Sequence, residues 1–109
     1  MDKYSIIITP NAIIQINEIA IYIFQTLSNP KAASNFLNSV EEKVSKLDLF
    51  PNAYPIVDKK PWNKLGVRKI LLKSFVIYYI VKNSAKQVLV LAVINGRRNR
   101  LEQLKNLVI

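Results

Sequence analysis

Positively charged side chains are the groups in this sequence most able to do chemistry. Three arginines, Arg97, Arg98 and Arg100, stand almost side by side near the C-terminal end, and Lys69 and Lys73 interrupt an apolar run earlier in the chain. Guanidinium and ammonium groups bind phosphate and carboxylate, so they suit a nucleic-acid backbone or an acidic peptide. If this segment begins a helix, the arginines lie at the positive end of the helix dipole, where positive charge is unfavourable. Such a placement favours a functional reason for the three arginines.

The charge is concentrated in the second half of the chain. The 109 residues hold 16 Lys and Arg against 7 Asp and Glu. Residues 1–55 carry a net charge of −1, whereas residues 56–109 carry +10. This asymmetry favours a nucleic acid, an acidic protein or an anionic membrane as the partner. A membrane fits least, because the longest apolar runs have seven residues and a span needs about 20. No secretory signal opens the chain, so we expect a cytoplasmic protein.

Several kinds of chemistry are excluded by composition. The sequence has no cysteine and no histidine, which excludes disulfide scaffolds, thiolate or imidazole metal sites and Ser-His-Asp catalysis. Asp58 and Glu102 are too isolated to form a catalytic pair of carboxylates. We therefore expect neither a metal ion nor a cofactor. Any proton transfer would depend on a lysine or a tyrosine.

Two helices are predicted near the start of the chain. Thr9–Pro10 and Asn29–Pro30 each indicate a helix start, because Thr and Asn cap free amides and Pro suits the first helical position. The second helix ends at Phe50–Pro51, since the residue before a proline disfavours helical geometry. The first helix, about Pro10 to Leu27, should bury a single apolar stripe of Ile13, Ile16, Ala20, Ile23, Phe24 and Leu27.

Four strands are predicted around this helical hairpin, from β-branched and aromatic runs at Tyr4–Thr9, Val67–Lys73, Phe75–Lys82 and Lys86–Ile94. Short breaks make the last three antiparallel neighbours, and the last two are apolar on both faces and so should be central. A short helix with Leu101, Leu104 and Val108 should end the chain. The prediction is one α+β domain over residues 1–109, ordered β-α-α-β-β-β, with the hairpin packed on one face of a four-stranded, mainly antiparallel sheet.

Strand alternation connects the cations to the sheet. In Val67–Lys73, Arg68 points to one face and Lys69 and Lys73 to the other, and the sequence leaves open which face the helices cover. Burying two lysines under a helix pair would be costly without partners. We expect the end of the sheet near Gly66 to lie close to the exit of the last strand, so that cations from both segments converge on one open face.

Structural explanations stand beside these binding hypotheses. Lysines on a strand at the edge of a sheet protect it against pairing with another chain. Tyr78 and Tyr79 suit the stacking of nucleic-acid bases, or alternatively the packing of a core. Trp62 lies in a proline-rich connecting loop with three lysines and either anchors that loop on the sheet or stacks on bases.

Short motifs run through nearly the whole chain in a fixed order: Ala12, Ile16, Ile19, Tyr22–Ile23, Ala32–Ala33, Phe36, Leu47, Phe50–Pro51, Gly66–Val67–Arg68, Phe75–Tyr79 and Val93–Arg98. In this order and spacing the chain resembles the RelE/ParE superfamily of bacterial toxins from type II toxin–antitoxin modules. It is most similar to the ParE-like branch, in which an FP pair follows the second helix, GxR opens a strand and GRR closes the last one. Asn95 and Asn99 stand where members of that branch often have His and Asp.

The resemblance implies a toxin that inhibits growth and is neutralised by a cognate antitoxin in a hetero-oligomer. An extended, acidic or amphipathic segment of the antitoxin would wrap the helical hairpin and the basic sheet. ParE-like toxins bind DNA gyrase and trap its complex with cleaved DNA, which requires a binding surface and no proton transfer. The residues implied for contact with target or antitoxin are Arg68, Lys69, Lys73, Arg97, Arg98 and Arg100.

Two alternatives follow from the same resemblance. RelE-like toxins cleave mRNA in the ribosome; here Arg98 would stabilise the transition state, Lys69 or Lys73 would act as the base, and Tyr78 would be a further catalytic candidate. The lack of histidine weighs against this activity. The third alternative is a degenerate toxin that acts only as a binding partner.

Overall fold

The computed structural model describes residues 3–96. The expected C-terminal helix, together with Arg97, Arg98 and Arg100, lies outside the described residues. The elements, in chain order, are β1 (Ser5–Ile8), α1 (Pro10–Gln25), α2 (Pro30–Ser45), the short 3-10 helix η1 (Lys46–Asp48), β2 (Arg68–Leu72), β3 (Phe75–Lys82) and β4 (Gln87–Asn95). This is the predicted β-α-α-β-β-β order. The second α-helix ends before the predicted Phe50–Pro51, and η1 follows it directly. No helix in this part of the chain is both long enough and apolar enough to cross a membrane.

Both helices begin at the predicted caps. The hydroxyl of Thr9 accepts a hydrogen bond from the amide of Ala12 at 3.3 Å, and the side chain of Asn29 accepts one from the amide of Ala32 at 3.0 Å. A proline follows each cap at the start of the helix. These contacts satisfy amides that the first turn of a helix leaves without partners. Capping hydrogen bonds between residues close in sequence therefore determine where the two helices of the hairpin begin.

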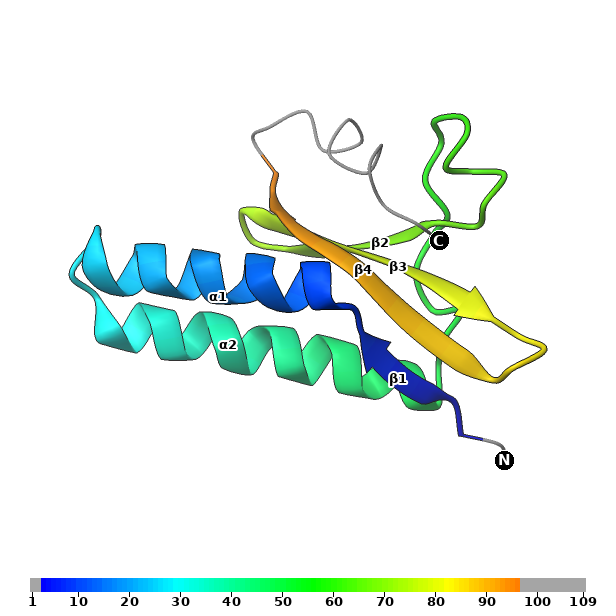
Figure 1. The fold of residues 1–109 in the computed structure, drawn as a ribbon, viewed down its shortest axis with the longest axis horizontal. Coiled ribbons are helices and arrows are strands. Elements are labelled where there is room, and N and C mark those ends of the chain that lie inside the picture. The colour runs from blue at the N-terminus through cyan, green and yellow to red at the C-terminus, as the bar shows by residue number, and fades with distance from the viewer. Residues whose placement is uncertain (1–2, 97–109) are drawn as a thin grey trace.

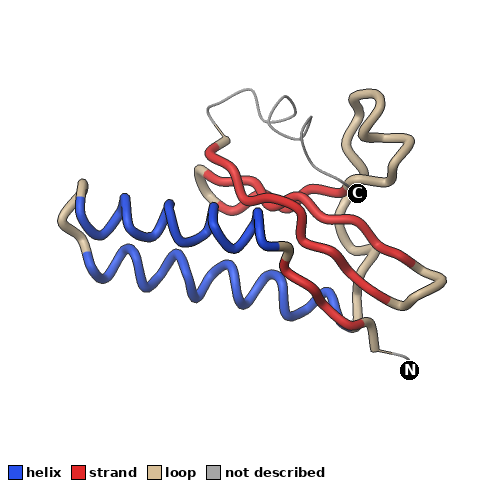
Figure 2. The backbone as a smooth tube through the Cα atoms, in the orientation of Figure 1, coloured by secondary structure: helices blue, strands red, loops and turns tan. Residues whose placement is uncertain are grey.

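The sheet has the strand order β1-β4-β3-β2, and the hairpin covers one of its faces (Figures 1 and 2). β1 pairs with β4 in parallel, whereas β4, β3 and β2 are antiparallel neighbours. β3 and β4 are central, as predicted, and most of their residues are buried. β1 and β2 form the two edges of the sheet.

Apolar side chains are buried on both faces of the sheet. Phe36 of α2 packs between the helices and the sheet, with its ring centre 5.0 Å from that of Phe75. The face away from the helices, here called the outer face, carries a second buried cluster that includes Val76, Tyr78 and Ile94, with Trp62 packed against it. The expectation of an open outer face is therefore wrong. The alternating residues of both central strands are apolar, so each face buries its own set.

A bulge in β4 ties the sheet to the start of α1. The pairing with β3 shifts between Tyr78 and Tyr79, which leaves Leu91 as the extra residue. The hydroxyl of Thr9 donates to the carbonyl of Val90 at 2.9 Å, and the amide of Val93 donates to the side chain of Gln15 at 2.9 Å. These bonds satisfy backbone groups at the irregular position and hold β4 in register with α1.

Candidate functional site

The structure settles which way β2 faces. Ile70 and Leu72 pack in the core beneath the helices, so Arg68 lies on that side of the strand. Its guanidinium is partly buried and donates a hydrogen bond to the carbonyl of Tyr54 at 2.6 Å. Lys69 lies on the outer face, in register with Tyr78. Arg68 and Lys69 are thus on opposite faces and do not form one cluster.

Arg68 belongs to a polar arrangement that fixes the connecting loop. It is in register with Tyr79, whose buried hydroxyl donates to the carbonyl of Pro51 at 2.8 Å. Burial raises the pKa of the Tyr79 hydroxyl above its ordinary value of 10.0, while the nearby charge of Arg68 acts in the opposite direction. The two side chains bind carbonyls at both ends of Pro51–Tyr54, so they hold this stretch against the sheet.

We expect the raised pKa of Tyr79 to lower the free energy of unfolding of the protein at high pH. Because the folded protein holds the pKa of Tyr79 above 10.0, the unfolded chain loses its proton first, and the free energy of unfolding should fall as pH rises from about 10. The contribution of one group is at most about 1.4 kcal/mol per pH unit. Tyr79→Phe should cost about 1 kcal/mol near neutral pH, because the Pro51 carbonyl loses its donor, and should make the alkaline decline shallower.

Urea unfolding of wild type and Tyr79→Phe between pH 7 and pH 11 measures both effects. Tyr22→Phe is the matched control, because Tyr22 is 55% exposed. An alkaline decline of the same steepness in wild type and Tyr79→Phe would show that Tyr79 does not contribute to it.

The last strand leaves the sheet at the end where Lys73 lies, and not at the opposite end, where Gly66 lies. The amide of Gly96 donates to the carbonyl of Ser74 at 2.6 Å, in the turn that begins with Lys73. Arg68 is level with Val90 across β3, about 13 Å along the strands from this end. The expectation that the end of the sheet near Gly66 lies close to the exit of the last strand is therefore wrong. β2 and β4 are both antiparallel to β3, so they run in the same direction and their starts lie at the same end.

The remaining predicted site residues differ in exposure. Tyr78 is only 2% exposed and belongs to the outer-face cluster, which agrees with the packing alternative rather than with base stacking. Lys69 is partly buried and Lys73 is exposed. Among residues 3–96, Lys73 is therefore the predicted contact residue that is exposed, whereas Arg68 and Lys69 are both partly buried. Arg97, Arg98 and Arg100 lie outside the described residues.

An exposed apolar surface on the hairpin was missed by sequence reasoning. Six large apolar side chains of α1 and the following turn are 47–57% exposed: Ile13, Ile14, Ile21, Tyr22, Phe24 and Leu27. We call this set the helix patch. These side chains spread around the part of α1 that does not face the core. Exposed apolar side chains in such number are typical of a surface that binds a protein partner. The signal was present in the sequence, because isoleucines occur all around α1 rather than on a single side.

A groove opens beside the helix patch. It has a volume of about 680 Å³ and lies between α1 and the end of the sheet at the β2–β3 turn. Tyr22 and Leu27 belong to both the groove and the helix patch, and Phe75 and Asn95 line its sheet side. Among residues 3–96, Glu18 is the only charged residue that lines it. This surface can accept apolar side chains from an elongated partner.

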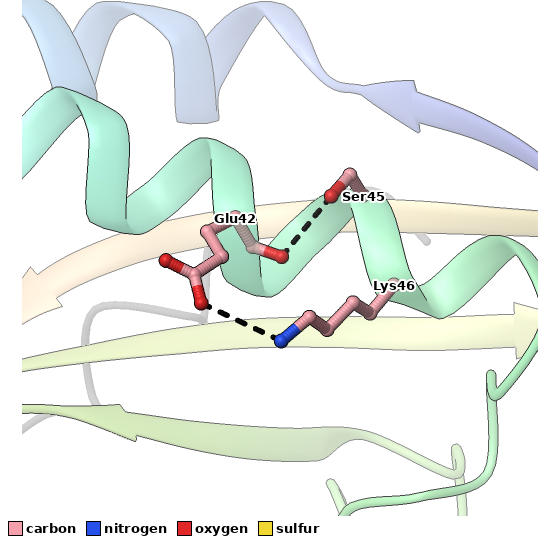
Figure 3. A network of polar contacts seen from close by, with 3 residues as sticks. All are labelled: Glu42, Ser45 and Lys46. Atoms are coloured by element: carbon pink, nitrogen blue, oxygen red, sulfur yellow. Dashed lines mark hydrogen bonds and ion pairs between the residues drawn. The ribbon is translucent and has the colours of Figure 1, made fainter.

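Charge pairing is sparse in the described part of the chain. The ion pair found there joins Glu42 of α2 to Lys46, the residue that follows this helix, with 3.4 Å between nitrogen and oxygen (Figure 3). Such exposed pairs contribute little to stability. Lys69 and Lys73 make no such pair with an acid among residues 3–96. Their charge is therefore not neutralised by ion pairs within that part of the chain.

The model of one protein family matches most of the chain. Residues 6–100 match the ParE toxin of the type II toxin–antitoxin system parDE. Among solved structures, the chain is similar to one from the chromosomal ParDE system of P. aeruginosa, with a TM-score of 0.69, 21% identity and coverage of 85% of this chain and 96% of that one. No curated protein matches the sequence.

A second solved structure extends the likeness in fold. It comes from the RelBE2 toxin–antitoxin complex of Mycobacterium tuberculosis and has a TM-score of 0.60 and 14% identity. The similarity covers 87% of this chain and 93% of that one. Similarity to these two structures, at 21% and 14% identity, shows that the chain shares their fold.

Proposed function

The chain belongs to the ParE toxin family of type II toxin–antitoxin systems, and from that premise we propose that it stops growth by binding DNA gyrase and that a cognate antitoxin neutralises it. The observation that carries the proposal is the family match over residues 6–100, which includes nearly all of the described fold. The proposal includes a cytoplasmic location, where gyrase acts on DNA.

Binding of the antitoxin is proposed at the hairpin. The helix patch and the neighbouring groove expose apolar surface to water in the free monomer. A partner that covers this surface would remove it from water. An amphipathic segment would bury its apolar side there, as peptides do in other helix-groove complexes. Acidic residues elsewhere on the same segment would meet the basic sheet, since residues 56–109 carry +10. Both solved relatives come from toxin–antitoxin systems, which agrees with such a partner.

Contact with gyrase is proposed through the cations at the sheet end where β4 leaves. Lys73 lies at that end, whereas Lys69 is a further contact on the outer face, about 10 Å back along β2. Arg97, Arg98 and Arg100 follow β4 in the sequence. The burial of Tyr78 supports a binding role over mRNA cleavage, because a side chain 2% exposed is not presented to a substrate.

Gyrase supercoiling of a relaxed plasmid tests the target. The wild-type protein should inhibit supercoiling, and Lys69→Ala with Lys73→Ala should raise the concentration needed by about tenfold, as the loss of interface contacts worth about 1.4 kcal/mol would do. Arg97→Ala with Arg98→Ala should act in the same direction. Lys31→Ala on α2 is the control and should behave as wild type.

A translating extract is the second arm of this experiment. Cleavage of mRNA at codon boundaries, with supercoiling unaffected, would replace gyrase by the ribosome as the target. A protein inactive in both assays would act only as a binding partner. Inhibition of supercoiling that none of the four substitutions relieves would contradict the proposed contact surface.

A further inference from the structure

The loop over residues 58–66 carries a group of positive charges that the contacts proposed for gyrase do not use. It carries Lys59, Lys60 and Lys64 against one acid, Asp58. All three lysines are exposed. No ion pair joins them to an acid among residues 3–96. Like charges held this close repel one another, so their grouping on one short loop calls for a reason beyond folding.

Hydrogen bonds make this loop a closed, rigid unit. The amide of Val57 donates to the carbonyl of Val67 at 2.9 Å, which joins its two ends. Within it, the amide of Asn63 donates to the carbonyl of Lys59 at 2.9 Å. The amide of Val67 donates to the carbonyl of Trp62 at 3.1 Å. Gly66 closes the last turn with a φ of +77°, a conformation that glycine adopts without strain. The backbone of the loop therefore has little conformational entropy left to lose on binding.

Trp62 fixes the side of the molecule on which the lysines stand. Its ring packs against the buried cluster of the outer face, on the side of the sheet opposite α2. The loop projects from the sheet on that side, away from the hairpin (Figure 1). The helix patch and these lysines are thus separate surfaces, and the loop can be occupied while the hairpin is covered.

The chemistry of the loop favours a phosphodiester backbone over an acidic peptide. The amides of residues 63–67 all donate within the loop, so none of them remains as a donor for a peptide strand. What the loop offers is three ammonium groups on flexible stems, which are point charges suited to phosphates without regard to base sequence. Duplex DNA presents one negative charge per about 1.7 Å of its axis, a denser row than a single strand has.

We propose that Lys59, Lys60 and Lys64 form a binding site for the phosphate backbone of duplex DNA. The contact is independent of base sequence and does not require gyrase. The loop supplies a rigid support and Trp62 anchors it to the sheet, while the lysine side chains bind phosphates along one strand. A toxin carrying this site would be held on DNA wherever its target acts.

Fluorescence anisotropy with a labelled 20-base-pair duplex over a range of salt concentrations tests the site. Lys59→Gln/Lys60→Gln/Lys64→Gln should weaken binding by about tenfold or more at 0.1 M salt. The slope of log K against log salt should become shallower by about 0.9 for each phosphate that the variant no longer binds. Circular dichroism should show the same melting temperature as wild type, because the three side chains are exposed.

The matched control removes the same charge from the other side of the molecule. Lys31→Gln/Lys43→Gln/Lys46→Gln takes three charges from α2 and its C-terminal cap and should leave the affinity within about threefold. Single-stranded RNA of equal length should bind less tightly than the duplex. Equal losses in the two triple variants, no binding of the duplex by wild type, or tighter binding of polyglutamate than of DNA would each overturn the proposal.

Discussion

Replacing Phe36 by alanine is expected to lower the free energy of unfolding by about 3–5 kcal/mol. Phe36 is 7% exposed, and its ring meets that of Phe75 at 5.0 Å with a tilt of 57°. The substitution leaves a cavity between α2 and β3 and removes the contact between the two rings. Because a domain of this size is stable by only about 5–15 kcal/mol, this loss is a large share of the total.

Urea unfolding followed by circular dichroism measures the change. Phe24→Ala is the matched control, since it makes the same substitution on the same hairpin at a residue 53% exposed. Its effect should stay within about 0.5 kcal/mol. Similar losses for the two variants would mean that Phe36 does not join the hairpin to the sheet as the structure indicates.

The helix starts and the central strands could be predicted because their signals are local. Thr9 and Asn29 cap helices by bonds to residues three positions later, so the sequence contains all that is needed. β3 and β4 are apolar at successive positions, which is typical of strands covered on both faces. Element order and fold class followed from these signals.

The buried side of α1 was predicted only in part, because its isoleucines surround the helix. Ile16 and Ile23 face the core as expected. Ile13, Phe24 and Leu27 belong to the same predicted stripe but are about half exposed. A periodicity argument needs polar residues to mark the outside, and this helix has few of them. Isoleucines on all sides of a helix are therefore the sequence signal for a second apolar surface, one that faces a partner.

One prediction about the cations was wrong for a topological reason, namely which end of the sheet lies beside the exit of β4, whereas the side that Arg68 faces was left open. The side that Arg68 faces depends on which of two alternating sets packs on the helices, and tertiary contacts alone decide it. The end of the sheet beside the exit of β4 follows from strand direction, and reasoning from antiparallel neighbours should have placed Lys73 there. The charge pattern shows which half of the chain carries the cations, but their placement on the sheet depends on strand register and direction.

Replacing Ile21 and Phe24 by glutamate is expected to abolish neutralisation while leaving the toxin active. Both side chains are 53% exposed in the helix patch, so the change adds charge at the surface and costs the free toxin little stability. In a complex, two carboxylates would be buried against apolar side chains of the partner. Each costs about 2 kcal/mol or more, and 2 kcal/mol is roughly a 30-fold loss of affinity.

The product of the reading frame adjacent to this gene is the partner to test, by co-purification and by rescue of growth. Asn35→Glu with Asn38→Glu is the matched control, because it places the same charges three residues apart on the exposed side of α2. Rescue should persist for the control pair and be lost for the helix-patch pair, and both variants should still inhibit supercoiling. Rescue of both would exclude the helix patch as the antitoxin site. Loss of inhibition in the helix-patch pair alone would instead assign this surface to the target, because the cations of the sheet are unchanged in that variant.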